Sequence, residues 1–448
     1  MISDQHFFSL TSSKHTDFII ISVLVVLLAI ENVVYAVARF LVQFNTSIEG
    51  MTLFIAITIG YVLGQTFLLR MMNSSSHAIK VRSNLITNLH TAVSIVQWVL
   101  VGNIILLIIQ MFVLSSYSIL SLIFVSYVSN FFTAGLLVIF ALRFVSWYRN
   151  GNQSLGILLY ALAFLILAAS EVMAAIGSGH ILSQKDEIIT PTSEIHYPNF
   201  PEGSILNIFF TSYQYVDYTS FLLILGGSAF LLYHYSKKTK TPKMIIIIAL
   251  PILSYTAVML DALNIYDTDT NPDLFYYYIF QSLALMSGGV LFAFSFWFIS
   301  KKLPESSVKT FLKITALGFI LLYLSNRLDV TSATYPPYGI NSLSLLPLAT
   351  YFVLFGLYSS ALSLSQDITL RQHLRSMARN DENLLSSIGT AQMETEVKRA
   401  VSELKDVADV EEKELAEQTG IETPIAENEV EDYLKQVIEE VSRARKKS

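Results

Sequence analysis

Residues 18–38 read FIIISVLVVLLAIENVVYAVA and contain a single charged side chain, Glu31. A helix needs about 20 mostly apolar residues to cross the roughly 30 Å hydrocarbon core of a bilayer, and this stretch is long enough. Because lipid offers no hydrogen bonds to backbone groups, a helix is the expected conformation of such a run. The stretch therefore predicts a transmembrane helix with a carboxylate inside it.

Similar apolar runs recur along the whole chain. The predicted spans cover residues 18–38, 51–69, 93–114, 118–142, 154–177, 205–235, 244–266, 274–299, 310–330 and 342–364. A transmembrane β-barrel needs segments of about ten residues with alternating polarity, and these runs do not alternate. Only 14% of the residues are charged, whereas soluble domains are about 25% charged. We expect an all-α polytopic bundle of ten helices in a lipid bilayer, with no nucleic-acid partner.

Charge is distributed unevenly, which divides the chain into three predicted parts. Residues 366–448 carry 19 acidic and 12 basic side chains, whereas the apolar spans before them are poor in charge. We therefore expect an N-terminal segment at 1–17, a transmembrane bundle at 18–365 and an acidic helical tail at 366–448. The chain contains no cysteine, so disulfides and thiol chemistry are excluded.

Basic residues in the connecting loops predict the orientation of the bundle. Lys and Arg gather in the loops at 70–92, 143–153, 236–243 and 300–313, and the loops between these are neutral or acidic. Loops rich in Lys and Arg remain on the cytoplasmic side of the membrane. The alternation predicts a multi-pass protein of the cell membrane with both termini in the cytoplasm.

Several polar side chains fall inside the predicted spans, mostly in their outer halves. A charge inside hydrocarbon is costly unless it is paired or faces water, so each suggests a function. They predict an outward-facing polar cup that binds a ligand. Two alternatives remain, in which these groups satisfy one another or line a permeation path. The residues of the predicted cup are Glu31, Glu171, Asp217, Asp261, Gln281, Arg327 and Asp329.

Catalytic motifs are missing from the sequence. No HExxH, Walker loop or nucleophile elbow occurs in a suitable context. The histidines fall in loops or near span ends, which does not suit the axial ligands of a membrane haem. We expect a protein without enzymatic activity and without a cofactor.

One outer loop partly matches a calcium-binding pattern. Asp267, Asp269, Asn271 and Asp273 stand at positions one, three, five and seven of such a loop. Pro272 replaces the glycine expected at position six, and the bidentate glutamate at position twelve is missing. The match therefore gives a weak metal-site prediction, beside the alternative of a solvated acidic turn.

The tail shows apolar stripes at helical spacing in residues 374–388, 393–407 and 430–441. The last span runs into residues 365–379 without a breaker, so we expect its helix to continue, and Gly389 predicts a later break or kink. Isolated helices need to bury an apolar face to be stable. The stripes favour coiled-coil-like self-association or docking of a cytoplasmic protein, with a solvated extension as the alternative.

Two stretches of the tail carry a resemblance. Residues 384–393 (LLSSIGTAQM) and 414–441 (ELAEQTGIETPIAENEVEDYLKQVIEEV) resemble the tails of uncharacterised multi-pass membrane proteins from ammonia-oxidising archaea. That family has no activity to transfer to this chain. A bundle with an outer cup and a helical cytoplasmic tail also resembles prokaryotic membrane sensor modules, although those commonly have seven spans and an output domain.

Together these features lead to two functional hypotheses. The first is a non-enzymatic receptor, sensor or scaffold, in which the outer cup is coupled to the tail through the last span. The second is a transporter or channel for a small cation or amine that uses Glu31, Asp217 and Asp261 as coupling carboxylates.

Overall fold

The computed structural model describes residues 13–77, 84–150, 154–193, 201, 203–235, 274–304, 306–325, 330–367, 369–371, 384–399 and 402. Nearly all of these residues are helical. Eight of the described helices have the length and apolar composition needed to cross a membrane. The chain is therefore an all-α, multi-pass helical bundle suited to a lipid bilayer.

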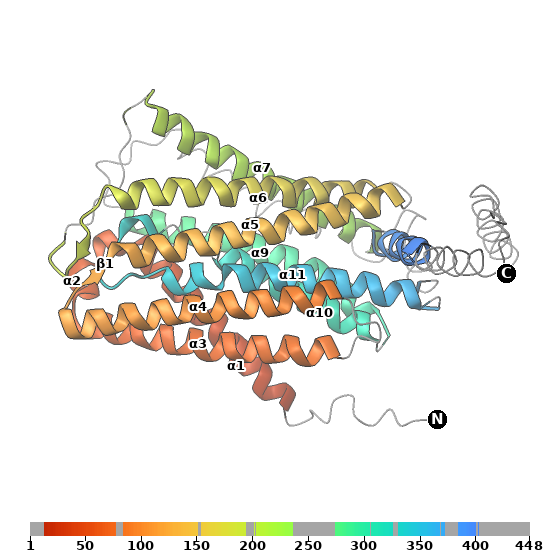
Figure 1. Ribbon diagram of the computed structural model, residues 1–448, viewed down its shortest axis with the longest axis horizontal. Coiled ribbons are helices and arrows are strands. Elements are labelled where there is room, and N and C mark those ends of the chain that lie inside the picture. The colour runs from red at the N-terminus through yellow and green to blue at the C-terminus, as the bar shows by residue number, and fades with distance from the viewer. Residues whose placement is uncertain are drawn as a thin grey trace, which may run out of the picture. The chain divides into compact units, whose positions relative to one another are not determined.

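Nine long helices make up most of the described chain (Figure 1). They are α1 (Ser13–Ala36), α3 (Ile48–His77), α4 (Asn84–Leu114), α5 (Ile119–Asn150), α6 (Leu155–Ser183), α7 (Ile205–Tyr235), α9 (Leu274–Lys302), α10 (Ser307–Ser325) and α11 (Ile340–Gln366). The short elements are η1 (Ala38–Phe40), α2 (Val42–Asn45), β1 (Tyr117–Ser118), β2 (Ile188–Ile189) and η2 (Val330–Ser332). Each long helix coincides with one predicted span. The remaining predicted span, 244–266, lies outside the described residues.

Helix α11 lies at the centre of the bundle. It packs against α10, α5, α4, α3 and α1, and Figure 1 shows it between α5 and α4. Every residue from Ile340 to Leu362 is buried. The helix is free of Lys, Arg, Asp and Glu, which suits a position where each of its faces meets another helix.

Close contact with α10 fixes α11 in place. A Cβ atom added to Gly356 of α11 would lie 2.7 Å from the carbonyl oxygen of Phe311 and 2.7 Å from the backbone nitrogen of Thr315. Gly318 of α10 would meet the backbone of Val353 in the same way, at 2.7 Å. Small residues allow helix backbones to approach closely, which is how helices associate in lipid.

A buried loop leads into the N-terminus of α11. Residues 330–339 are all buried although only η2 is helical. The Tyr117 hydroxyl donates to the Thr334 carbonyl at 2.7 Å, and the Tyr338 hydroxyl donates to the Gly50 carbonyl at 2.7 Å. Irregular backbone at membrane depth is tolerated when protein covers it. Next to it, β1 pairs with β2 in antiparallel register, Tyr117 opposite Ile189.

The C-terminal end of α11 differs from the sequence-based expectation. The helix ends at Gln366, and Asp367 has an extended backbone with φ −105° and ψ 100°. The Asp367 carboxylate accepts hydrogen bonds from the Leu370 backbone N–H at 2.9 Å and the Thr369 hydroxyl at 2.7 Å. Asp367 thus caps a new helical turn, and the predicted uninterrupted helix through residues 365–379 is wrong.

Of the break or kink predicted at Gly389, the break is wrong, because residues 384–399 are helical through that position. The glycine serves a close contact instead, since a Cβ atom there would lie 2.8 Å from the Cβ of Leu364 in α11. Trp147 of α5 also reaches this segment, donating from Nε1 to Oε1 of Gln392 at 2.9 Å. The chain divides into two compact units, Met1–Gln392 and Met393–Ser448, and these contacts belong to the first.

Candidate functional site

The Glu31 carboxylate of α1 lies at the N-terminus of α11 and is fully buried. Its Oε1 accepts hydrogen bonds from the backbone nitrogens of Gly339 (3.0 Å) and Asn341 (3.3 Å) and from Nδ2 of Asn341 (2.9 Å). Its Oε2 accepts from the backbone nitrogen of Ser342 (3.0 Å) and from the Ser342 hydroxyl (2.7 Å). Donors from α11 and its cap therefore occupy both oxygens.

The chemistry of a helix N-terminus explains this arrangement. The first N–H groups of a helix have no partner within the helix, and the helix dipole places about half a positive charge there. A carboxylate accepts hydrogen bonds from these N–H groups, and its negative charge is attracted to the positive end of the helix dipole. Gly339 can point its N–H at Glu31 because its φ is 97°, a conformation that suits glycine. The structure thus gives Glu31 a role in anchoring α11.

Neighbouring polar side chains join two further helices, α10 and α3, to this point. Asn32 donates from Nδ2 to the carbonyls of Leu28 (2.8 Å) and Leu324 (3.0 Å), which links α1 to α10. Asn341 also donates from Nδ2 to the Thr58 hydroxyl of α3 at 3.2 Å. Buried polar networks of this kind fix one packing arrangement when their members are satisfied.

Four fully buried side chains continue this polar region along α3, α4 and α11, and we call Tyr61, Gln65, Gln97 and Asn341 the amide cluster. Three of them, Gln65, Gln97 and Asn341, have an atom without a hydrogen-bond partner among the described residues, and these atoms are both amide atoms of Gln65, Gln97 Oε1 and Asn341 Oδ1. Gln97 also donates from Nε2 to the Ser344 carbonyl at 2.9 Å, which joins α4 to α11.

Sequence reasoning missed the amide cluster because it searched chiefly for charges. One signal was present, since Thr58, Tyr61 and Gln65 are spaced at i, i+3 and i+7 and so share one face of α3. Gln97 gave no such signal. Its position depends on how α4 is rotated toward α11, and one sequence alone does not show this.

A second buried polar region lies on α6 and α7. Glu171 and Asp217 are both buried. The antiparallel register of the two helices follows from the Tyr160 and Ser228 hydroxyls, which are 3.0 Å apart. Counting 11 residues onward from Tyr160 and 11 back from Ser228 reaches Glu171 and Asp217. The structure thus brings these two predicted cup residues to the same level on adjacent helices.

Helix α5 presents hydroxyl groups to the same region. Ser126 of α5 and Ser178 of α6 share a hydrogen bond. Seven residues further along α5 is Thr133, and seven residues back along α6 is Glu171, so the register places them opposite each other. The Thr133 hydroxyl is fully buried and has no hydrogen-bond partner among the described residues. Two carboxylates and a hydroxyl therefore share one level of α5, α6 and α7.

The structure keeps Glu31 apart from this second region, since α1 packs against α3, α9, α10 and α11, whereas α6 packs against α5 and α7. Gln281 lies in α9, but its side chain is outside the described residues. The remaining predicted residues are outside the description altogether: Asp261, Arg327 and Asp329 of the cup, and Asp267, Asp269, Asn271 and Asp273 of the metal-site prediction. Among the residues that the structure does describe, no three acidic or histidine side chains gather as a metal site.

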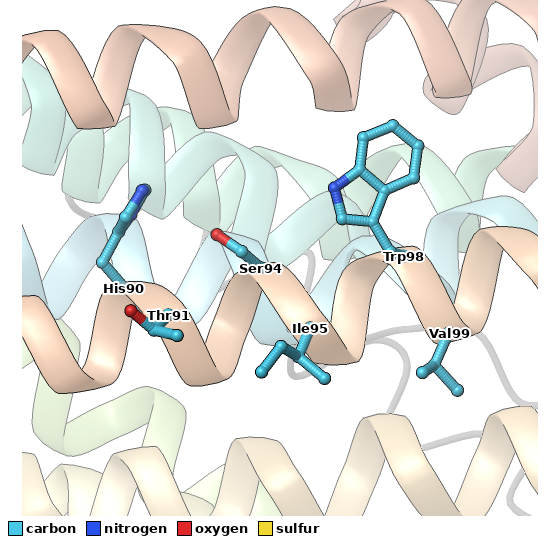
Figure 2. A pocket seen from close by; sticks show the side chains of 6 residues that line it. All are labelled: His90, Thr91, Ser94, Ile95, Trp98 and Val99. Atoms are coloured by element: carbon cyan, nitrogen blue, oxygen red, sulfur yellow. The ribbon is translucent and has the colours of Figure 1, made fainter.

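A shallow groove of about 530 Å³ runs along α4 (Figure 2). Figure 2 shows His90, Ser94 and Trp98 projecting from one side of the helix and Thr91, Ile95 and Val99 from the other. Ile95 is 59% exposed and Trp98 is 52% exposed. Because α4 alone lines the groove and its apolar residues are open, the groove forms part of the surface that a bilayer would cover.

Comparisons of the chain with protein-family models, with curated proteins and with solved structures found no match.

Proposed function

We propose that the protein is a non-enzymatic membrane receptor in which α11 couples a polar site in the outer half of the bundle to the segment at 384–392. One observation carries this proposal: α11 is buried along its length, held at its N-terminus by Glu31 and in contact with Gly389 at its other end.

A rigid central helix suits such coupling. At 1.5 Å per residue, α11 is about 40 Å long. Packed elements change between discrete arrangements more readily than they deform, so a shift at one end is carried to the other. A ligand at Glu171 and Asp217 would act through α5, which packs against both α6 and α11. The tail beyond Gln392 would then present the signal to a cytoplasmic protein or to a second chain.

A single cysteine tests the coupling, because the natural chain has none. Ser387 is buried at 2% exposure, so Ser387→Cys should react slowly with a maleimide in purified protein in nanodiscs. Adding Glu31→Gln places an amide N–H₂ among the donors of α11 and should release its N-terminus. We expect labelling of the Ser387→Cys thiol to become at least fivefold faster.

Controls separate coupling from unfolding. Ser183→Cys, at an exposed position of α6, should react equally fast with and without Glu31→Gln. Glu49→Gln, which changes an exposed glutamate, should leave Ser387→Cys labelling unaltered. If Glu31→Gln protein keeps its helicity and labelling at position 387 does not change, the receptor proposal fails.

The second candidate function is transport of a small cation or amine. Gln65 and Gln97 favour it, because they place buried polar groups near the middle of α3 and α4. Liposomes containing the purified protein should take up a labelled cation, and Asp217→Asn should reduce the uptake. Uptake equal to that of empty liposomes would exclude this function and favour the receptor.

A further inference from the structure

The orientation of two amides makes the amide cluster a group of oxygen acceptors. Gln97 uses Nε2 for the Ser344 carbonyl, so its Oε1 points away from that bond. Asn341 uses Nδ2 for Glu31 and Thr58, so its Oδ1 remains as an acceptor. These two carbonyl oxygens are fixed by the bonds that their own nitrogens make.

The other two members can add oxygens to the same set. The Tyr61 hydroxyl can accept as well as donate, and the Gln65 amide can turn either atom inward because neither has a partner among the described residues. Tyr61 and Gln65 are four residues apart on α3, so they are neighbours on one helix face. Native proteins rarely leave buried polar atoms without a hydrogen bond, and the amides of Gln65, Gln97 and Asn341 therefore point to a bound species.

Charge in this region favours a cation. Glu31 contributes one negative charge, and the N-terminus of α11 offsets about half of it. Helices α4 and α11 contain no Lys or Arg, and neither does α1 from Ile19 to Ala36. The one Lys or Arg of α3, Arg70, is exposed. In α1 from Ile19 to Ala36, α4 and α11, Glu31 is therefore the charged side chain that contacts the N-terminus of α11, close to oxygen acceptors that have no partner among the described residues.

We propose that Tyr61, Gln65, Gln97 and Asn341 bind a monovalent metal cation of the sodium or potassium class, with the Glu31 carboxylate supplying the nearby charge. Amide and hydroxyl oxygens are ligands that can replace the hydration shell of such an ion, as carbonyl oxygens do in ion-selective channels. A divalent ion would want more carboxylate ligands. The site lies beneath the N-terminus of α11 and does not depend on the receptor proposal.

Thermal unfolding of the full chain in nanodiscs tests the site. Sodium chloride or potassium chloride replaces choline chloride at constant ionic strength, so that only the size and hydration of the cation change. A species that binds only the folded state raises the unfolding midpoint with its concentration. We expect a saturable rise with one of the two metal ions and none with choline. Ammonium chloride is the fourth salt. Ammonium can donate hydrogen bonds and a metal ion cannot, so the comparison distinguishes a site for a metal ion from a site for a hydrogen-bond donor.

Variants connect the rise to the cluster. Gln65→Met and Gln97→Met each replace an amide with an apolar side chain of similar length, and each should increase the half-saturating metal concentration at least tenfold. Gln43→Met, which changes an exposed glutamine, should keep the wild-type response.

Three outcomes would overturn the proposal. The first is an unfolding midpoint that is the same in sodium, potassium and choline. The second is a rise with ammonium alone, which would indicate a hydrogen-bond donor in place of a metal ion. The third is an undiminished response in both methionine variants. The four-salt comparison on wild-type protein remains decisive even if a variant fails to fold.

Discussion

The two ends of α11 are held by different kinds of interaction. At the N-terminus, one buried carboxylate from α1 accepts five hydrogen bonds. At the C-terminus, Leu364 packs against Gly389 and the helix gives way to a turn capped by the half-exposed Asp367. Moving the first end would separate buried charge from its donors, whereas moving the second disturbs apolar and local contacts. The C-terminal end is therefore the one that can move.

Removing the carboxylate at the N-terminal end should have the largest effect. Glu31→Ala leaves three backbone N–H groups and two side-chain donors without their acceptor. Breaking one side of a buried charged interaction costs about 3–5 kcal/mol. We expect this loss in the free energy of unfolding, measured by denaturant titration in detergent micelles.

An exposed glutamate provides the matched control for that measurement. Glu49→Ala changes a carboxylate that is open to solvent and should alter the free energy of unfolding by less than about 0.5 kcal/mol. A Glu31→Ala loss as small as this would contradict the contrast between the two ends of α11.

The middle of α11 should respond next most strongly. Gly356→Ala would place a methyl group 2.7 Å from the Phe311 carbonyl oxygen and from the Thr315 backbone nitrogen. Since backbone atoms cannot turn aside, we expect a loss of about 1–3 kcal/mol, as for other overpacked sites. Gly135→Ala of α5 is the control, because a Cβ atom there has nothing within 4 Å and Ala is the better helix former. Equal losses in both variants would show that α10 and α11 are free to separate.

Features that depend on residues close together in the sequence could be predicted, whereas contacts between residues far apart in the sequence could not. The helices follow from local apolar runs, and Glu31 attracted notice as a charge inside one of them. The hydrogen-bond partners of Glu31 could not be predicted, because Gly339, Asn341 and Ser342 lie about 310 residues away in the sequence. Nothing in the neighbourhood of either segment specifies that pairing, which depends on how α1 and α11 pack.

Two local signals were open to different interpretations. Gly389 can end a helix or allow a close approach, and only the contact with Leu364 decides for the second. Asp367 is a preferred capping residue, so its sequence position already offered a signal for the end of α11. The neutral Gln65 and Gln97 gave weak signals. From sequence alone, a glutamine in a predicted span could be buried in the bundle or could lie near a loop or the lipid headgroups, and only its neighbours in the structure distinguish these positions.

The contact at the C-terminal end should give a smaller, local effect. Gln392→Leu leaves the buried Trp147 N–H without the acceptor that it uses at 2.9 Å, which costs about 1–3 kcal/mol. We expect the largest increase in hydrogen exchange, measured by mass spectrometry, in residues 384–392 and a weaker increase at the N-terminus of α11, because the proposed coupling acts in both directions. No increase at the N-terminus of α11 would contradict that coupling.

The smallest effect concerns the cap that follows α11. Hydrogen bonds from the Leu370 backbone and, with a smaller effect, from the Thr369 hydroxyl hold the pKa of Asp367 below its ordinary value, against the opposing effect of partial burial. A carboxyl with a lowered pKa stabilises the folded state above its unfolded pKa of about 3.9, and this stabilisation is lost as the pH falls through the folded pKa. In protein labelled with ¹⁵N-leucine, the Leu370 amide should therefore shift with a midpoint below pH 3.9. Asp367→Asn keeps an acceptor oxygen but cannot titrate, so it should abolish the shift. A midpoint at or above 3.9 would show that the cap does not favour the ionised carboxylate, and the C-terminal end of α11 would then be held by its apolar contacts alone.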